Sequence, residues 1–140
     1  MVTLIHKNLF TSSHSLAHCV SEDFAMGAGI AVQFKKMWGN EILSVVGSRI
    51  IKFPCCVPVQ IGDRYIFNLV TKKYYNYFPT YNTLKKALIE MFEFAQANHI
   101  DTIAMPKIAA GLDRLDWSRV QIILEDLAVQ HMVNIEVYYL

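Results

Sequence analysis

The segment Arg64-Tyr-Ile-Phe-Asn-Leu-Val-Thr-Lys72 carries the strongest strand signal in this chain. Its apolar residues first alternate with polar ones and then run on almost without a break, which is the pattern of a buried strand. A turn signal, Gly62-Asp63, comes directly before it. We therefore predict a buried strand from Tyr65 to Val70, with Lys72 at the lip of its carboxyl end.

Helices and strands alternate on both sides of this stretch. The clearest helix runs from Thr80 to Asn98, because Thr80 can cap it and apolar residues recur at helical spacing after it. Further helices are predicted at Ile30–Trp38, with Ile30, Phe34 and Met37 on one face and an end at Gly39-Asn40, and at Trp117–His131. Strands are predicted at Val2–Ile5, Ser15–Val20, Ile103–Met105 and Ile135–Tyr139, with two less regular candidates at Arg49–Lys52 and Cys56–Val59. This alternation indicates an α/β protein in which helices pack on a sheet.

Size and charge limit the possible functions. The chain has 140 residues, of which 54% are hydrophobic, so we expect one domain, residues 1–140, with an ample core. The 13 Lys and Arg residues against 12 Asp and Glu residues give a formal net charge of +1, which is too small to predict nucleic-acid binding. A local basic patch could still form around Lys35-Lys36 and Lys72-Lys73. We expect a monomer.

The three cysteines, Cys19, Cys55 and Cys56, lack the spacing of a zinc site. We therefore expect free thiols, no metal and no cofactor, which suits a reducing compartment such as the cytosol or the nucleus. The first residues, Met1–Lys7, lack the apolar core and the cleavage site of a signal peptide. No apolar run approaches the length of a membrane span, so we expect no membrane partner.

Two charged residues at strand ends are the candidates for chemistry. Lys72 ends the stretch quoted above, and Asp113 ends Met105-Pro-Lys-Ile-Ala-Ala-Gly-Leu-Asp113, which follows another short strand. Loops at strand ends build the active sites of open α/β sheets. A lysine amine can attack an electrophilic carbon, and a nearby carboxylate can carry its protons. Taken alone, Lys72 is better explained as a surface lysine, and Asp113 as a loop carboxylate or a helix cap.

Two glycine-containing loops, Ser21–Ala31 and Lys107–Leu112, lie at predicted strand ends. Glycines let backbone N–H groups approach a ligand, and a helix N-terminus follows the first loop, so a phosphate would suit it. A tight turn better explains one such loop, whereas two together could clasp a diphosphate. The aromatic run Tyr74–Phe78 could wall a ligand pocket or stack on a base, and packing on a neighbouring helix has equal weight. His18 is expected to be a hydrogen-bonded core residue.

Several longer strings make the chain recognisable. They are Ser15-Leu-Ala-His-Cys-Val-Ser-Glu-Asp, Met26-Gly-Ala-Gly-Ile-Ala-Val-Gln-Phe-Lys-Lys, Arg64-Tyr-Ile with Thr71-Lys-Lys, Pro79-Thr-Tyr-Asn-Thr-Leu, and Met105-Pro-Lys-Ile with Gly111-Leu-Asp-Arg-Leu-Asp-Trp. In this order they resemble a macrodomain, most of all the branch of terminal ADP-ribose protein glycohydrolases, from about Ile5 to Leu140. The resemblance implies a three-layer α/β/α fold with a central mixed β-sheet and a cleft for ADP-ribose.

The resemblance also implies roles for individual residues. In that branch a lysine attacks the anomeric carbon of the distal ribose and displaces the carboxylate of a modified Glu or Asp, and an aspartate then assists breakdown of the lysine adduct. The lysine matches Lys72, the aspartate matches Asp113, and a serine near the distal ribose matches Ser21. The diphosphate loops match Met26, Gly27, Ala28, Gly29 and Ile30, together with Lys107, Ile108, Ala109, Ala110, Gly111 and Leu112. The adenine end matches Leu9, Tyr138 and Leu140.

Two positions depart from the family pattern. Asn8 stands where an aspartate usually reads the adenine amine, although its side-chain oxygen can accept the same hydrogen bond. Ala109 stands where a glycine is usual, so its methyl group narrows the space for a phosphate and disfavours positive φ. Both changes bear on affinity more than on chemistry. The lysine must be neutral to attack, and Lys73 is a candidate for the neighbouring cation that favours the neutral amine.

Three functions follow as alternatives. The first is a hydrolase that removes mono-ADP-ribose from acidic side chains and also deacylates O-acetyl-ADP-ribose, with ADP-ribose and ADP-ribosylated proteins as its partners. The second is a reader that binds ADP-ribose without turnover, and the third is a phosphatase acting on ADP-ribose 1″-phosphate. Lys72 and Asp113 favour the hydrolase, and no other nucleophile or base stands out for the phosphatase. A related branch acts on ADP-ribosylated DNA bases, and the near-neutral charge is a mild argument against it.

Overall fold

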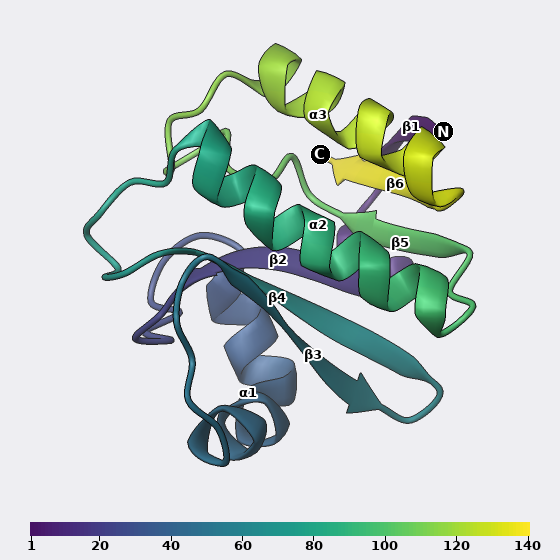
Figure 1. Cartoon of the computed structure of the whole chain (residues 1–140). Helices are drawn as coiled ribbons and strands as arrows, with labels where there is room; N and C mark the ends of the chain where they lie inside the picture. Colours follow the sequence, from purple (N-terminus) through teal and green to yellow (C-terminus); the bar gives the residue numbers. More distant parts are fainter.

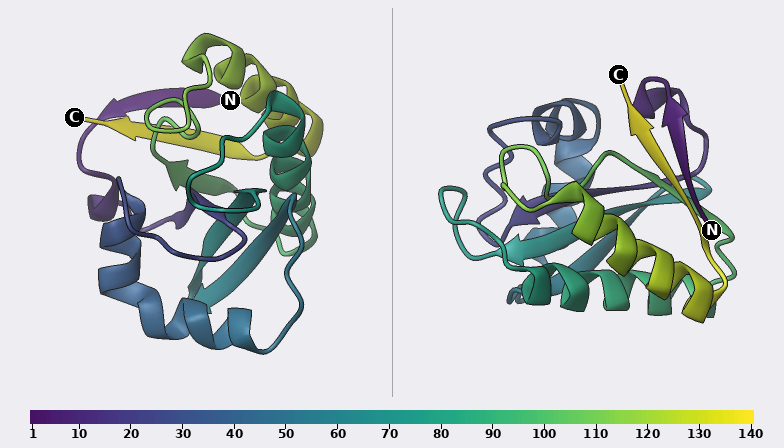
Figure 2. Two further views of the ribbon diagram at one scale, coloured as in Figure 1. Left: turned by 90° about the vertical axis from the view of Figure 1, so that its left-hand side faces the viewer. Right: turned by 90° about the horizontal axis from the view of Figure 1, so that it is seen from above.

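The computed structural model describes residues 1–140 and contains six strands and three α-helices (Figure 1). The strands are β1 (Val2–His6), β2 (Ser15–Ser21), β3 (Cys55–Ile61), β4 (Arg64–Lys72), β5 (Thr102–Met105) and β6 (Asn134–Tyr139). The helices are α1 (Ala31–Gly47), α2 (Tyr81–Ala97) and α3 (Trp117–His131), with a short 3-10 helix, η1 (Leu9–Thr11), after β1. Helices α2 and α3 cover one face of the sheet and α1 covers the other (Figure 2). The architecture is the expected three-layer α/β/α sandwich.

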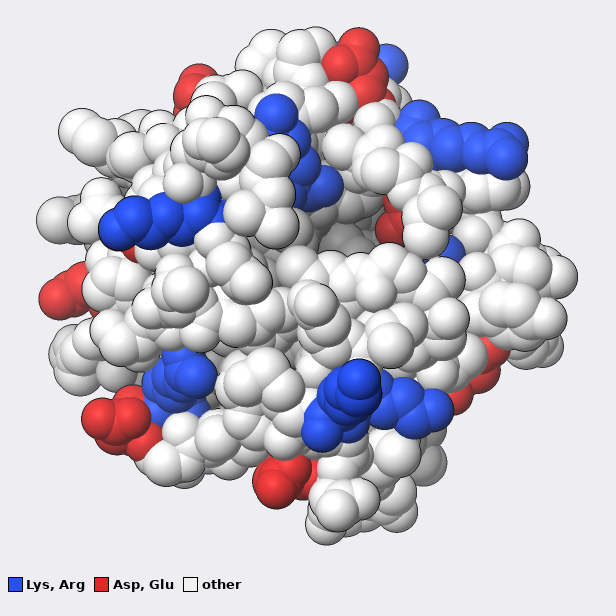
Figure 3. All heavy atoms as spheres, turned by 180° about the vertical axis from the view of Figure 1, so that it is seen from behind, with Lys and Arg blue, Asp and Glu red and all other residues white.

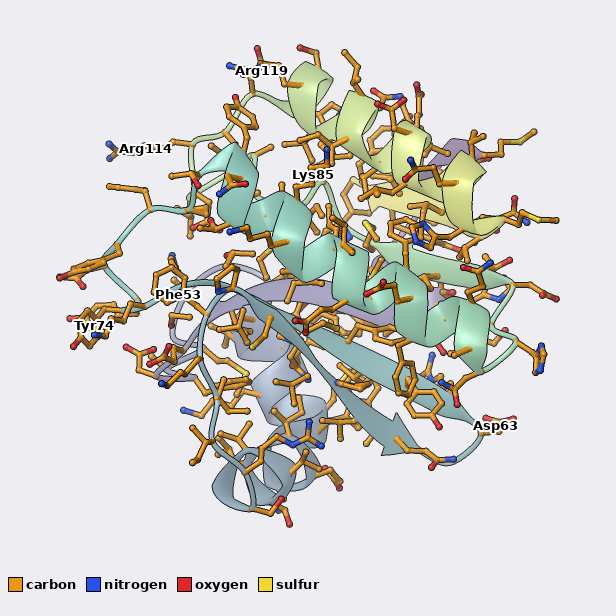
Figure 4. All side chains as sticks on the ribbon, viewed as in Figure 1. Phe53, Asp63, Tyr74, Lys85, Arg114 and Arg119 are labelled. Carbon is orange, nitrogen blue, oxygen red and sulfur yellow. The ribbon has the colours of Figure 1, made fainter.

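The strands form one mixed sheet in the order β1-β6-β5-β2-β4-β3. All neighbouring strands are parallel except β3 and β4, which form an antiparallel hairpin. Because β2, β4 and β5 are parallel, their carboxyl ends, Ser21, Lys72 and Met105, point to the same edge of the sheet. In Figure 4, Tyr74 and Arg114 lie at this edge, whereas Asp63, in the hairpin turn, lies at the opposite end.

Two apolar layers hold the helices to the sheet. Strand β4 is buried without interruption from residue 66 to residue 71, as its sequence predicts. Phe67 and Leu69 pack in the layer beneath α2 and α3, whereas Ile66 and Val70 pack in the layer beneath α1. Full burial of one such side chain contributes about 1.5–3 kcal/mol relative to leaving it exposed. The sheet is therefore fixed from both sides at the strands that lead to Ser21 and Lys72.

Helices α2 and α3 match their predictions closely. The Thr80 hydroxyl accepts a hydrogen bond from the Thr83 backbone amide at 3.1 Å, and the Thr83 hydroxyl accepts one from the Thr80 amide at 3.0 Å. This reciprocal pair satisfies two amides at the start of α2. Helix α3 has the predicted bounds, Trp117–His131, and Asp116 caps it. None of the helices is both long and apolar enough to cross a membrane.

The prediction for α1 is wrong at its C-terminal end. The helix does not stop at Gly39-Asn40 but continues to Gly47 after a kink at Trp38, whose φ is −136°. The kink leaves Met37 51% exposed, unlike the fully buried Phe34, and brings Trp38 and Ile42 into the core. Burial of these two side chains outweighs the poor helix propensity of Gly39 and Asn40.

The strand proposed at Arg49–Lys52 is also wrong. The segment is irregular, and Ile50 is exposed to solvent. Within this segment only Ile51 packs against the core, so the segment lacks the buried face of a strand. The neighbouring candidate, Cys56–Val59, does form a strand and lies within β3.

Candidate functional site

A cavity of about 790 Å³ opens at the carboxyl ends of β2 and β4 and beside the loop that follows β5. Its walls come from residues 19–21, 25–31, 72, 75–78, 106–109 and 111–114. Figure 3 shows a hollow on the far side of the view in Figure 1, with acidic and basic atoms in one wall. A cavity of this size, with mostly apolar walls and a few charged groups, suits a small-molecule ligand.

Lys72 and Asp113 meet in the wall of this cavity. The Lys72 Nζ lies 2.8 Å from the Asp113 Oδ1, and each side chain is only 15% exposed. Strand β4 delivers the lysine, and the loop between β5 and α3 delivers the aspartate. Lys72 is therefore not a surface lysine, and Asp116, rather than Asp113, caps α3, so of the plainer roles only that of a loop carboxylate describes Asp113. The arrangement gives an amine and a carboxylate that can exchange a proton directly beside a ligand-sized space.

Lys73, which follows Lys72 directly, contacts the aromatic run and not the cavity. Its Nζ lies 5.6 Å from the ring centre of Tyr74, and the residue does not line the cavity. The charged partner of Lys72 is the Asp113 carboxylate, and not a second cation. The role of Lys73 in favouring a neutral Lys72 amine stays a prediction, and Asp113 is the nearest acceptor for a proton on Lys72.

Ser21 lines the cavity at the end of β2, opposite Lys72 in the register of the sheet. Its hydroxyl donates a hydrogen bond to the carboxylate of Asp23. Asp23 also accepts hydrogen bonds from the backbone amides of Ala25, at 3.2 Å, and Tyr75, at 3.1 Å. Desolvation disfavours the charged carboxylate, but these hydrogen bonds and the charge of Lys72 outweigh it and lower the pKa of Asp23. The sequence analysis missed Asp23, although it stands in the recognised string Ser15–Asp23.

The first glycine-containing loop has an unusual backbone. Phe24, Met26 and Gly29 adopt positive φ values of 50°, 47° and 61°. A Cβ added at Gly29 would lie 3.4 Å from the Leu112 side chain of the second loop, so the two loops approach closely there. No side chain caps the N-terminus of α1, which follows this loop. Residues 26–30 all line the cavity, so its wall includes the positive end of a helix dipole.

The second loop confirms the strain expected at Ala109. This residue has a φ of 61° and is only 6% exposed, so its methyl group is held inside the structure in a conformation that favours glycine. Its carbonyl accepts a hydrogen bond from the Leu115 amide at 2.9 Å. Of the residues predicted for this loop, Ala110 does not line the cavity, whereas all the others do: Lys107, Ile108, Ala109, Gly111 and Leu112. Lys107 lies 5.1 Å from the ring centre of Tyr139, on the β6 side.

The residues assigned to the adenine end do not line the cavity. The Asn8 side chain caps η1 by accepting a hydrogen bond from the Phe10 amide at 2.9 Å. Leu9 is buried, Tyr138 packs against the layer that contains it, and Leu140 is exposed. Asn8 has a second lone pair on the same oxygen, so it can still accept a hydrogen bond from a ligand. The adenine assignment stays a prediction.

The aromatic run forms one wall of the cavity. Residues 75–78 line it, yet Tyr75, Tyr77 and Phe78 are each more than half exposed, so the wall stands at the mouth and not in the core. The Arg114 guanidinium, on the loop that carries Asp113, lies 4.5 Å from the ring centre of Phe78. Of the two roles considered for this run, the structure selects the pocket wall.

His18 and Cys19 illustrate how burial quenches reactivity. His18 is fully buried, with its Nε2 2.7 Å from the Asn68 Oδ1 and its ring stacked on Phe34, as expected of a core histidine. Burial lowers the pKa of His18 to about 4. Cys19 lines the cavity, but burial raises the pKa of its thiol, so it is a poor nucleophile. All three cysteines are free, and no cluster of His, Cys, Asp or Glu could hold a metal ion.

Solved structures with the same fold are known. The macrodomain of DarG from Mycobacterium tuberculosis superposes with a TM-score of 0.89 and 23% identity, covering 99% of this chain and 97% of that one. DarTG of Thermosipho africanus, solved in complex with ADP-ribose, superposes with a TM-score of 0.82 and 17% identity, covering 98% of this chain and 41% of that one. At these identities the likeness concerns the fold alone.

Comparison of sequences identifies the family. The ADP-ribose glycohydrolase OARD1 of Homo sapiens is 38% identical over 141 residues, covering 99% of this chain and 91% of that protein. The DNA ADP-ribosyl glycohydrolase of Thermus aquaticus is 26% identical, covering 99% of this chain but only 40% of that protein. The family described as Macro domain matches residues 17–124. From this match and the 38% identity, the chain belongs to the macrodomain family.

Proposed function

We propose that this protein is an ADP-ribose-binding glycohydrolase that removes mono-ADP-ribose from glutamate and aspartate side chains. The observation that carries the proposal is the contact of 2.8 Å between Lys72 Nζ and Asp113 Oδ1 in the wall of the cavity. Relatives named as ADP-ribose glycohydrolases support the same reaction class. A protein that only binds ADP-ribose has no need of an amine and a carboxylate at this place.

The two loops would hold the diphosphate. Residues 26–30 supply backbone amides and the N-terminus of α1, and residues 107–109 face them from the second loop. Backbone amides at a helix N-terminus favour phosphate oxygens without any need for a basic side chain. The bound diphosphate would set the position of the ligand along the cavity. The distal ribose would then lie beside Lys72, and the leaving group would point toward the aromatic wall. Positioning of this kind supplies much of the rate acceleration in reactions between bound groups.

The reaction begins with a proton transfer. Lys72 passes a proton to Asp113, and the free amine attacks the anomeric carbon of the distal ribose. A carbon–nitrogen bond forms as the carbon–oxygen bond to the modified carboxylate breaks, and that carboxylate leaves with the electron pair. Asp113 gives its proton to the departing carboxylate and, again a carboxylate, takes one from the water that adds to the same carbon. The carbon–nitrogen bond breaks, and Asp113 returns that proton to the amine. The products are free ADP-ribose and the unmodified side chain, and both active-site residues return to their starting state.

Two of the alternatives find less support. A phosphatase would need a further nucleophile or base, and the remaining candidate in the cavity, Cys19, has a thiol whose pKa is raised by burial. A deacylase acting on O-acetyl-ADP-ribose could use the same pair, so we propose it as a second reaction of this site. A reader would bind ADP-ribose and release nothing from modified proteins.

A second substrate class is favoured by one observation. The rim of the cavity presents Tyr75, Tyr77 and Phe78, each more than half exposed, and flat rings of this kind can stack on a nucleobase. The relative from Thermus aquaticus is named for activity on DNA. We therefore propose ADP-ribosylated DNA bases as the alternative substrate, with the same lysine and aspartate acting at the same carbon.

One experiment separates these functions. The protein would be incubated with a peptide carrying ADP-ribosyl-glutamate, with single-stranded DNA carrying an ADP-ribosylated base, and with ADP-ribose 1″-phosphate. Released ADP-ribose and phosphate would be measured by chromatography, with Lys72→Ala as the control. Release from the peptide supports the first proposal, and release from the DNA alone supports the second. Binding of ADP-ribose with no release from any substrate would leave the protein a reader.

A further inference from the structure

Asp23 occupies a junction between three parts of the site. One carboxylate oxygen accepts hydrogen bonds from the Ser21 hydroxyl and from the Ala25 amide, the latter at 3.2 Å. The other oxygen accepts one from the Tyr75 amide at 3.1 Å. Asp23 therefore links the end of β2, the first glycine-containing loop and the aromatic wall through a single side chain.

The loop around Asp23 needs such support. Phe24 and Met26 take positive φ values of 50° and 47°, which residues other than glycine adopt at a cost. Their side chains are buried, so packing contributes to holding the conformation. The hydrogen bond from the Ala25 amide to Asp23 fixes Ala25, which lies between Phe24 and Met26. The loop that carries residues 26–30 of the cavity wall is thus tied back to Ser21.

The aromatic wall is weakly held apart from this bond. Tyr75 is 68% exposed, so its side chain gains little from packing. Beyond Asp23, the wall is tied by the Arg114–Phe78 contact at its far end and by a turn bond from the Tyr77 amide to the Tyr74 carbonyl at 3.0 Å. The Glu22 amide donates to the Lys72 carbonyl at 2.9 Å, so the two loops diverge from adjacent strands immediately beside Lys72.

We propose that Asp23 is a positioning residue for the glycohydrolase reaction, acting through Ser21 and Tyr75. Because Ser21 donates its proton to Asp23, the lone pairs of its oxygen are left to accept a hydrogen bond from a ribose hydroxyl. Through Tyr75 the same carboxylate fixes the wall against which the leaving group lies. Asp23 thereby sets the distance between the anomeric carbon and Lys72. This role rests on the proposed function, and it concerns turnover more than affinity for ADP-ribose.

Asp23→Asn tests the proposal with little change of shape. The carboxamide keeps an oxygen for Ser21 and Ala25 but turns an NH₂ group toward the Tyr75 amide, so the bond to the wall is lost. We expect kcat on the ADP-ribosyl-glutamate peptide to fall about 10- to 100-fold, because small misplacements of reacting groups have effects of this size. The KM and the Kd for ADP-ribose measured by calorimetry should stay close to the wild-type values. Asp63→Asn, in the hairpin turn at the opposite end of the sheet, is the matched control and should retain full kcat (Figure 4).

Two further measurements identify the route. Ser21→Ala and Asp23→Ala should not be additive, so the double variant should be about as slow as the slower single variant. Amide exchange followed by NMR should show a protected Tyr75 N–H in the wild type and a faster one in Asp23→Asn, with melting temperatures recording the fold of each variant. An unchanged kcat in Asp23→Asn, equal Tyr75 exchange in both proteins, or a loss of affinity that matches the loss of kcat/KM would overturn the proposal. An inactive wild type would instead refute the proposed function, and the positioning role of Asp23 with it.

Discussion

Among single residues, the proton of the Lys72–Asp113 ion pair controls the proposed reaction. An ammonium group has no lone pair, so it cannot attack until its proton has moved. With both side chains only 15% exposed and Nζ 2.8 Å from the carboxylate, the nearest acceptor is Asp113. The two residues then act at different steps. Lys72 forms the covalent adduct, and Asp113 acts a second time when water hydrolyses that adduct. Substituting each in turn should separate the steps.

Lys72→Ala should abolish release of ADP-ribose from a modified glutamate and leave ADP-ribose binding largely intact, because the loops hold the diphosphate. Asp113→Ala should also stop turnover, but later, since Lys72 without its partner can lose its proton to water and still attack. A covalent protein–ADP-ribose adduct should then accumulate, visible as a mass increase on intact-protein mass spectrometry. The double variant should show no adduct.

The neighbouring lysine provides the control for this pair. Lys73 lies outside the cavity, so Lys73→Ala should retain turnover close to that of the wild type. Full activity in Lys72→Ala would show that Lys72 is not the nucleophile. The reader or another hydrolytic mechanism would then have to explain the site.

Ala109→Gly should stabilise the protein and tighten ADP-ribose binding. Its φ of 61° suits glycine, and relief of that strain outweighs the extra freedom of glycine in the unfolded chain, for a gain of up to about 1 kcal/mol in the free energy of unfolding. Removal of the methyl group also widens the cavity for a phosphate. Urea denaturation and calorimetry would measure the two effects. Ala110→Gly, with no positive φ and no place in the cavity wall, should do neither, and equal behaviour of the two variants would disprove the strain argument.

Among the elements, the two ends of α1 offer a direct test of the diphosphate site. Gly29→Glu should abolish ADP-ribose binding, because its side chain would meet Leu112 and place a negative charge where phosphates would lie. Gly47→Glu adds the same charge at the other end of the helix, where a Cβ meets nothing within 4 Å, and binding should be unaffected. Calorimetry with ADP-ribose compares them. Binding by Gly29→Glu at wild-type affinity would place the diphosphate elsewhere.

The elements also show what the sequence could and could not predict. Helix α2 was predictable because Thr80 forms a local cap with Thr83, and α3 because of its own periodicity, although its cap is Asp116 and not Asp113, the residue considered for that role. The extension of α1 past Gly39 was not predictable, since it depends on burial of Ile42 beneath the sheet. Helix bounds are predicted correctly where local interactions set them. The prediction fails where packing against distant residues sets them.

The same division applies to the site. Lys72 and Asp113 could be paired in advance because parallel strands bring their carboxyl ends together. Asp23 escaped notice because its partner, the Tyr75 amide, lies 52 residues away and is a backbone group, which leaves no mark in the sequence. The sequence likewise did not show that the aromatic wall is exposed, because its place at the mouth of the cavity depends on the fold.

At the scale of the whole molecule, His18 couples folding to pH. Its Nε2 is bound to Asn68, and its Nδ1 is buried with no partner. A proton added to the Nδ1 would therefore be buried without a hydrogen-bond acceptor. Burial lowers its pKa from 6.5 to about 4. Above pH 6.5 both folded and unfolded chains hold this group neutral, and the coupling vanishes. As the pH falls from 6.5 to about 4, the unfolded chain binds a proton that the folded one refuses, and stability falls by on the order of 3 kcal/mol.

Urea denaturation at a series of pH values would measure this loss. His18→Gln, which can still donate to Asn68, should be less stable at neutral pH because it loses the stacking on Phe34, but its stability should vary less between pH 6.5 and 4. His99→Gln, at an exposed position, is the control and should keep the wild-type slope. An identical pH dependence in His18→Gln and the wild type would assign the acid sensitivity to other groups.

The position of β1 at the edge of the sheet has a consequence for synthesis. Its only neighbour is β6, and Val2 pairs with Ile135. A ribosome releases β1 long before it makes β6, so this strand must wait while β2, β4 and β5 assemble without it. Joining it to the sheet closes a loop of almost the whole chain, which is slow because of the entropy it costs. Until then β1 is an unpaired strand on a nascent chain, open to pairing with its neighbours on the same polysome.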